Sequence, residues 1–232
     1  LEGNGGADTL DGAGGDDTIL GGLGGDTITG GAGTNTLDGD GGADTFVAGT
    51  GIDLIDGGDG VDTVNYTADT AGITIAIDGV AGVGGLGEDD TLTDVETILG
   101  GSGNDDFTGD TLVDVETILG GSGNDTITGD ANSNTLSGGA GGDTLSTGAG
   151  GTNALNGQAG NDVIIVTAGT NALDGGDNRI EAGSGGDTLV GNTADNIIDG
   201  NAGDDTITGA AGTNTLRGGA GDDTFIGGAG AD

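Results

Sequence analysis

The sequence predicts an all-β fold in which short parallel strands stack into a solenoid. Three observations support this prediction: a nine-residue motif repeats along most of the 232-residue chain, 61 residues are glycine, and proline is absent. A repeat of this length cannot bury an apolar face alone, so successive copies must coil and stack on one another. Two copies, each with one tight turn and one short strand, make a circuit of 18 residues.

The motif reads G-G-x-G-x-D-x-U-x, where U is a large apolar residue, as in 21–29. Glycine at positions one, two and four permits the positive φ values and close backbone approach of a tight turn. Positions seven to nine, usually Thr, U and a small or polar residue, predict a three-residue strand with its central side chain inward. Seven gapless copies fill residues 3–65, and their eighth positions are Leu10, Ile19, Ile28, Leu37, Phe46, Ile55 and Val64.

The spacing of the copies predicts three regions, at residues 1–65, 66–119 and 120–232. The third region repeats the motif with one extra residue before 148 and one shortened copy at 175–181. Both repeat regions are therefore expected to form rolls, and the middle region is expected to continue the solenoid less regularly.

The middle region combines a longer strand with part of a duplication. Alternation of Ile73, Ile75 and Ile77 with smaller residues predicts a half-buried strand, followed by a glycine-rich loop at 79–87. Residues 91–110 and 111–130 are identical except at the aligned positions 93/113, 106/126 and 107/127. A recent tandem duplication is the simplest explanation.

Composition restricts the chemistry to hard cations. The chain has 40 acidic and two basic residues, with a formal charge of −38, so nucleic acid and anionic membranes are excluded as direct partners. Without Cys or His, the chain lacks thiolate and imidazole metal ligands and the usual general base. Carboxylate and carbonyl oxygens favour Ca²⁺ or Mg²⁺. No catalytic residues, enzyme activity or membrane-spanning segment is predicted.

The nonapeptide resembles that of the RTX (hemolysin-type) calcium-binding repeat family, over nearly the whole chain. The resemblance implies a right-handed parallel β-roll with two short strands and two Gly/Asp turns per circuit, and several Ca²⁺ ions between consecutive circuits. It also implies type I secretion and an extracellular or bacterial cell-surface location. In this family the sixth position supplies a carboxylate and loop carbonyls supply the other ligands. The matching residues are Asp8, Asp17, Asp26, Asp44, Asp53, Asp62, Asp105, Asp125, Asp143, Asp162, Asp187, Asp205 and Asp223.

Alternate copies lie on the same edge of such a roll, so the sixth positions form two columns. In the first region these are Asp8, Asp26, Asp44 and Asp62 on one edge, and Asp17, Asn35 and Asp53 on the other. In the third region Asp and Asn alternate, which predicts a charged edge opposite an edge of stacked amides without ions, and about half the calcium density. Counting leaves open whether 175–181 moves the Asp column to the other edge, and whether Asn-bearing turns bind calcium.

Four further features lie outside the main pattern. Glu96 and Glu116 match the motif register and are expected either at the metal edge or, in the preferred interpretation, as solvated acids on a loop. Tyr66 is expected to pack at the end of the first repeat region. Position-seven threonines predict an exposed row, which in the preferred interpretation reflects the β propensity of Thr on an exposed strand. The alternative is a flat Thr array, which resembles the calcium-dependent ice-binding modules of some RTX adhesins. The expected breaks in that row are Leu54, Asp106, Ala154, Val163, Ala172 and Ile197.

The preferred function is a structural calcium-binding roll of a secreted or cell-surface bacterial protein, such as an adhesin, sheath fibril or surface-layer component. Backbone entropy of about 1–2 kcal/mol per residue exceeds what one apolar residue in nine offsets, so folding is expected to require calcium. Two alternatives stay open: the C-terminal roll of an exported protease, lipase or toxin, and an ice- or polysaccharide-binding module. The N-terminal residues 1–3 include neither a starting Met nor a signal-peptide pattern, so the chain is expected to be a fragment or a processed piece. Both ends fall inside a motif copy, so head-to-tail self-association into a filament or lattice is a further hypothesis.

Overall fold

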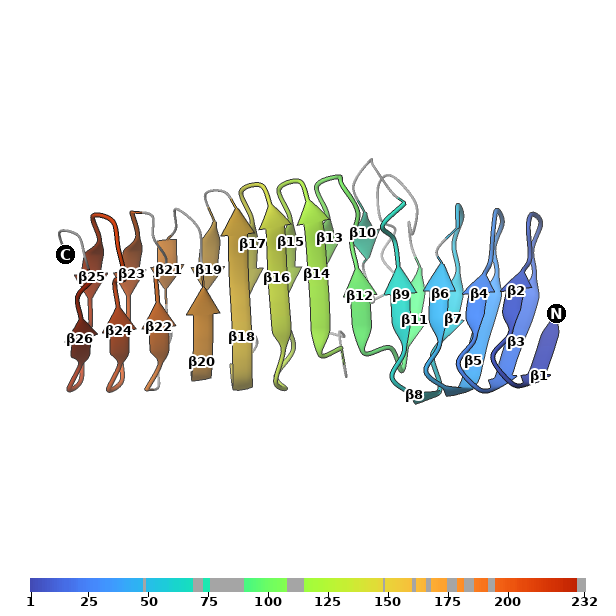
Figure 1. The fold of residues 1–232 in the computed structure, drawn as a ribbon, viewed down its shortest axis with the longest axis horizontal. Helices are drawn as coiled ribbons and strands as arrows, with labels where there is room; N and C mark the ends of the chain where they lie inside the picture. Colours follow the sequence, from blue (N-terminus) through green and yellow to red (C-terminus); the bar gives the residue numbers. More distant parts are fainter. Residues whose placement is uncertain are drawn as a thin grey trace. The chain divides into compact units, whose positions relative to one another are not determined.

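The computed structural model confirms an all-β solenoid of parallel strands (Figure 1). It describes residues 1–47, 49–68, 73–75, 90–107, 115–147, 149–159, 162–165, 168–174, 179–181, 186–191 and 195–228. Within these residues every regular element is a strand, and no helix suited to crossing a membrane occurs. The chain forms two compact halves, an N-terminal half at Leu1–Ile118 and a C-terminal half at Leu119–Asp232.

The N-terminal half contains two stacks of parallel strands that alternate along the chain. One stack has the order β1 (Glu2–Gly5), β3 (Thr18–Leu23), β5 (Thr36–Gly42), β7 (Leu54–Asp56) and β11 (Thr91–Thr93), with β8 (Asp59–Gly60) also beside β5. The other has the order β2 (Thr9–Asp11), β4 (Thr27–Thr29), β6 (Thr45–Val47), β9 (Thr63–Asn65) and β12 (Thr97–Leu99). Thr9 pairs with Thr27 and Thr27 with Thr45, so strand pairing repeats at the predicted circuit length.

The interrupted region contributes one further described pair, β10 (Thr74–Ile75) beside β13 (Asp106–Phe107). Ile73 and Phe107 are fully buried, so this pair also faces the core. The rest of the predicted strand at 73–77 and the glycine-rich loop at 79–87 lie outside the described residues.

The C-terminal half repeats the arrangement with longer and shorter circuits. β14 (Thr117–Ser122) crosses the division in the sequence. One stack contains β15 (Thr126–Thr128), β17 (Thr144–Ser146), β19 (Val163–Ile165), β21 (Arg179–Glu181), β23 (Ile197–Asp199) and β25 (Thr215–Arg217). The other contains β16 (Thr135–Ala140), β18 (Ala149–Ala159), β20 (Ala168–Asp174), β22 (Thr188–Val190), β24 (Thr206–Thr208) and β26 (Thr224–Ile226).

The core of each half consists of the large apolar side chains at position eight. In the N-terminal half, Ile19, Ile28, Leu37, Phe46, Ile55 and Val64 are all fully buried. Full burial of one such side chain contributes about 1.5–3 kcal/mol. Ordering the rest of its motif copy costs about 1–2 kcal/mol per residue in backbone entropy alone, so the core stabilises the fold too little without a second contribution.

The turn positions favour glycine for two different reasons. Gly24, at position four, has φ +131°, and Asp40, at position two, has φ 68°, so both positions lie in the left-handed region. At position one glycine is used for close approach and not for positive φ, which Gly39 does not adopt. A Cβ on Gly39 would instead lie 2.5 Å from both Oδ2 of Asp44 and the carbonyl oxygen of Gly57. Position one therefore requires glycine because the space beside it is needed.

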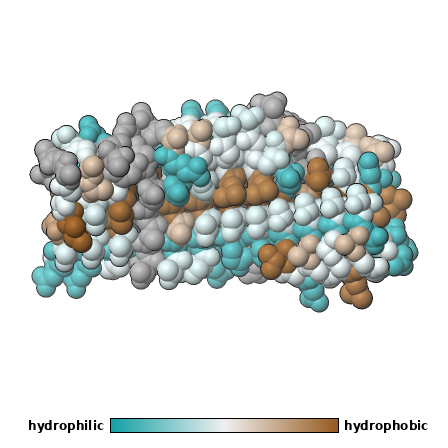
Figure 2. Space-filling view, viewed as in Figure 1, coloured by the Kyte–Doolittle hydropathy of each residue, from teal (hydrophilic) through white to brown (hydrophobic). Residues whose placement is uncertain are grey.

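The position-seven threonines form an unbroken row in one stack of the N-terminal half. Strand pairing places Thr9, Thr27, Thr45, Thr63 and Thr97 in register. Leu54 does not interrupt this row, because it lies on β7 in the other stack. In the C-terminal half, Ala154 does interrupt the corresponding row, because it pairs with Thr135. Figure 2 shows a surface in which pale and teal residues dominate and brown hydrophobic residues form smaller groups.

Candidate metal centres

Residues at the sixth motif position connect consecutive circuits through one carboxylate oxygen. The backbone N–H groups of Asp8, Asp26 and Asp44 donate to Oδ1 of Asp26, Asp44 and Asp62 at 2.7, 2.7 and 2.8 Å. Asp26, Asp44 and Asp62 are each at most 2 % exposed. Each carboxylate thus lies inside the turn column, and its Oδ1 is occupied by a backbone donor from the preceding circuit.

The second carboxylate oxygen in these columns is buried and accepts no hydrogen bond. This holds for Oδ2 of Asp8, Asp17, Asp26, Asp44, Asp53, Asp62, Asp143 and Asp205. Leaving a buried polar group unsatisfied costs about 1–3 kcal/mol, and more if the group is charged. Successive carboxylates in one column also repel one another. At neutral pH, a cation in contact with the Oδ2 atoms would offset both costs.

Position-one glycines let a carboxylate oxygen and a carbonyl oxygen of the next circuit converge. A Cβ on Gly21 would lie 2.6 Å from Oδ2 of Asp26 and 2.9 Å from the carbonyl oxygen of Gly39 in the next circuit. The same pair of oxygens surrounds Gly12, at 2.8 Å from Oδ2 of Asp17 and 2.6 Å from the carbonyl of Gly30. A carboxylate with backbone carbonyls is the oxygen set that Ca²⁺ accepts in flexible geometry. The residues present therefore fit calcium.

The C-terminal half contains the same carboxylate ladder. Asp125 and Asp143 donate their N–H groups to Oδ1 of Asp143 and Asp162 at 2.8 and 2.9 Å. Asp187 and Asp205 donate to Oδ1 of Asp205 and Asp223 at 2.9 and 3.0 Å. These aspartates thus occupy turn columns like those of the N-terminal half.

Asp105 differs from the other predicted ligands. Its Oδ1 accepts the N–H of Ile73 at 2.9 Å, as expected for a ladder position. Its Oδ2 accepts the N–H of Gly101, within its own turn, at 3.0 Å. Because a backbone donor already contacts this oxygen, Asp105 is a weaker candidate ligand than the aspartates whose Oδ2 accepts no hydrogen bond.

Asn35 and Asn196 place an amide nitrogen where aspartate places its second oxygen, whereas Asn134 places its Oδ1 beside Gly129. Nδ2 of Asn35 would lie 2.8 Å from a Cβ on Gly30, and it donates to Oδ1 of Asp53 at 2.8 Å. In the C-terminal half, Nδ2 of Asn196 donates to Oδ1 of Asn214 at 2.9 Å. An amide NH₂ group has no acceptor capacity for a cation. The geometry therefore supports stacked amides in place of ions at these turns.

Two ladder residues, Asp90 and Glu96, differ from the sequence interpretation. The N–H of Asp53 donates to Oδ1 of Asp90 at 2.7 Å, and that of Asp62 to Oε2 of Glu96 at 2.5 Å. The preferred expectation for Glu96 is wrong, because β12 pairs in register with β9 and so places Glu96 directly after Asp62 in its column. The Asp-Thr-Leu run at 90–92 matches motif positions six to eight and could have identified Asp90. Glu116 is exposed.

Tyr66 provides a hydroxyl donor at the end of the second column. It is fully buried, and its hydroxyl donates to Oδ2 of Asp90 at 2.9 Å. Burial and the nearby charge of Asp90 raise the pKa of Tyr66 well above its usual value, so the phenol stays protonated. At Asp90 the neutral hydroxyl of Tyr66 thus donates to Oδ2, whereas Oδ2 of Asp53 accepts no hydrogen bond. Packing alone, as expected from the sequence, is an incomplete account of Tyr66.

Burial raises the pKa of several column carboxylates, which predicts a specific pH dependence without calcium. Desolvation and the neighbouring charges of Asp44, Glu96 and Asp56 raise the pKa of Asp62 from 3.8 to about 6. Between these two values the folded state binds more protons than the unfolded state, so the free energy of unfolding falls as the pH rises. In chelator, lowering the pH from 7 to 5 should therefore increase the β signal in circular dichroism. An unchanged or smaller signal at pH 5 would contradict the assigned burial.

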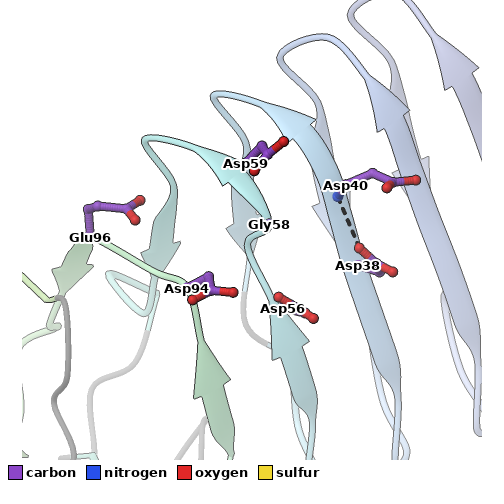
Figure 3. Close-up of a pocket in the computed structure, with 7 residues that line it drawn as sticks. All are labelled: Asp38, Asp40, Asp56, Gly58, Asp59, Asp94 and Glu96. Atoms are coloured by element: carbon purple, nitrogen blue, oxygen red, sulfur yellow. Dashed lines mark hydrogen bonds between the residues drawn. The ribbon is translucent and has the colours of Figure 1, made fainter.

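Beside the end of the first column lies a strongly acidic pocket. It is lined by Asp38, Asp40, Asp56, Gly58, Asp59, Asp94 and Glu96 (Figure 3). The N–H of Asp40 donates to Oδ1 of Asp38 at 3.0 Å, and β5 and β7 place Asp38 and Asp56 side by side. Burial, as the larger cause, and the charge of Asp38 both raise the pKa of Asp56. The pocket concentrates negative potential next to Asp62.

Comparison with protein families agrees with this geometry. The family model for the RTX calcium-binding nonapeptide repeat, which spans four copies, matches residues 2–37, 38–70, 111–145, 147–179, 181–216 and 208–232. A search of curated proteins finds no match. The matched segments cover most of the chain and contain all predicted calcium ligands except Asp105. The chain therefore belongs to the family of RTX calcium-binding nonapeptide-repeat proteins.

Proposed function

We propose that this chain is a structural calcium-binding β-roll of a secreted or cell-surface bacterial protein, and that it folds when calcium binds outside the cell. The observation that carries the proposal is the set of buried Oδ2 atoms without donors, which recurs from Asp8 to Asp205. At Gly12, Gly21 and Gly39 such an oxygen shares its space with a carbonyl of the next circuit, so a bound ion connects two circuits. Calcium binding free energy then becomes folding free energy.

The charge of the chain supports the same conclusion. A formal charge of −38 favours the expanded chain when no cation is bound, because the carboxylates repel one another. Extracellular calcium-binding modules operate at about 10⁻⁴–10⁻³ M calcium. Inside a cell, where calcium is scarcer, the chain would stay unfolded and suited to export. A role in an adhesin, sheath fibril or surface layer is consistent with a module whose repeats are devoted to stacking and ion binding.

A calcium titration followed by far-UV circular dichroism and small-angle scattering tests this proposal. In chelator at pH 7, we expect a coil spectrum and the radius of gyration of an unfolded chain of this length, about 50 Å. Millimolar calcium should produce a β spectrum and a smaller radius. Magnesium serves as the control and should be much less effective, because it demands a small octahedral site. A β spectrum already complete in chelator would contradict the proposal.

A further inference from the structure

We infer that the shortened circuit at residues 175–181 moves the calcium column of the C-terminal half from one edge of the roll to the other. This half would then hold two separate rows of calcium ions, here called files, one on each edge of the roll. A ladder of stacked amides would lie on the edge opposite each file. The inference rests on the proposed function for the identity of the ion. The exchange of edges itself rests on strand register and hydrogen bonds.

Strand register shows that this circuit is shorter than its neighbours. Val163 on β19 pairs with Arg179 on β21, and Ala172 on β20 pairs with Thr188 on β22. In the circuits after it, the ladder hydrogen bonds join groups 18 residues apart in the sequence. The residues of both strand pairs just named lie closer together in the sequence than that. Before it, two ladder hydrogen bonds join groups 19 residues apart. The stacks themselves continue through the short circuit, since β21 still pairs with β23 and β22 with β24.

The stacks continue without interruption while one motif copy is short. As a result, aspartate and asparagine exchange places between the two edges. The first edge is formed by the position-six residues that directly precede β15, β17, β19, β23 and β25. The second is formed by the position-six residues of β16, β18, β20, β22, β24 and β26, which directly precede their strands except in the longer β18 and β20, where they lie within the strand. In that order, the first edge carries Asp125, Asp143, Asp162, Asn196 and Asn214. The second carries Asn134, Asn153, Asn171, Asp187, Asp205 and Asp223. Each edge thus has aspartates on one side of the short circuit and asparagines on the other.

The order of aspartate and asparagine at position six in the sequence explains the exchange. Aspartate and asparagine alternate copy by copy, but Asn171 is followed by asparagine at 178, within the short copy, before aspartate returns at 187. Two successive asparagines shift the alternation by one turn. Since each circuit contains two turns, a shift of one turn places every later aspartate on the opposite edge.

The hydrogen bonds keep aspartate stacked on aspartate and asparagine on asparagine on both sides of the exchange. The aspartate ladders are those of 125–162 and 187–223. Opposite them, the N–H of Asn134 donates to Oδ1 of Asn153 at 2.8 Å, and that of Asn196 to Oδ1 of Asn214 at 3.0 Å. Buried Oδ2 atoms without donors occur in both aspartate ladders, at Asp143 and Asp205.

Two files on opposite edges have a physical consequence for calcium binding. Ions in one file connect only the circuits of that file, so the loss of one file leaves the ligands of the other unchanged. The two ladders also share no residue, and mutations in independent sites are additive. The C-terminal half should therefore bind calcium in two separable sets rather than in one continuous array.

Distance measurements on the full chain test the exchange of edges without reference to calcium affinity. The sequence has no native cysteine, so pairs of introduced cysteines can carry spin labels. In calcium, labels in V163C/I197C should be two strand spacings apart, about 10 Å. In the comparison pair V163C/T188C, the labels lie on different stacks and should be farther apart. The reverse order of distances would overturn the exchange.

Calcium counting tests the two files. Asp143→Asn should lose ions from the first file only and Asp205→Asn from the second only, and the double variant should lose the sum. Asp204→Asn makes the same charge change at an exposed neighbour and should retain every ion. Equal losses in the double and single variants would overturn two independent files. A wild-type chain that binds no calcium would instead overturn the proposed function, while the spin-label result would still decide the exchange of edges.

Discussion

Replacing Gly39 with alanine is expected to abolish calcium binding between two circuits of the N-terminal half and to destabilise that half strongly. The new Cβ would lie 2.5 Å from Oδ2 of Asp44 and from the carbonyl oxygen of Gly57, so it would occupy the space assigned to the ion. Overpacking alone costs about 1–3 kcal/mol, and the lost ion adds to this cost. Calcium counting and urea unfolding in millimolar calcium measure the two contributions.

Gly41 offers a matched control in the same turn. Its Cβ would meet nothing closer than Cδ2 of Leu23 at 3.6 Å, an ordinary contact, and its φ is not positive. Gly41→Ala should therefore keep its calcium and change the free energy of unfolding little. If both variants bind calcium equally well, the space beside position one is not the ion site.

Replacing Tyr66 with phenylalanine is expected to destabilise the N-terminal half by about 1.5–3 kcal/mol, the usual contribution of a hydrogen bond to a charged group. The substitution keeps the buried ring but removes the hydroxyl that donates to Oδ2 of Asp90 at 2.9 Å. Without this donor, the buried carboxylate of Asp90 loses one hydrogen bond, and a nearby cation would offset part of that loss. Urea unfolding at several calcium concentrations should show a larger calcium dependence for the variant than for the wild type.

A double-mutant cycle with Asp90→Asn separates this hydrogen bond from general packing. Oδ1 of the asparagine can still accept the N–H of Asp53, so the ladder is preserved while the charge beside Tyr66 is removed. The effects of Tyr66→Phe and Asp90→Asn should be non-additive, as for residues in direct contact. Additive effects would show that the phenol does not stabilise this carboxylate.

The two predictions concern two different environments of a buried position-six carboxylate. At Asp44 a glycine leaves room beside a carboxylate oxygen, and at Asp90 a buried hydroxyl donates to the equivalent oxygen. Stacked amides, as at Asn196, are a third arrangement in which the side chain supplies its own donor. The three arrangements differ at the second polar atom of the buried position-six side chain, and only the first leaves an anionic oxygen for a metal ion. The number of positions that use each arrangement determines how much of the fold depends on calcium.

The sequence by itself determined the period, the strands and the core, because these depend on residues close together in the chain. A turn of glycines, a Thr and one apolar residue in nine specify a strand and its buried face locally, as at 21–29. The candidate ligands followed from the same motif, since each is the acidic residue at position six, directly before a strand.

Only the tertiary structure decided which turns stack on which. Glu96 and Asp90 join the columns of Asp62 and Asp53 through contacts across 34 and 37 residues, which include the interruption of the repeat after residue 65. The edge exchange likewise depends on whether the stacks continue through the shortened circuit, which strand pairing determines. The physical reason is that hydrogen bonds between circuits set the register of a solenoid, and local residue patterns do not record how an insertion or deletion is absorbed.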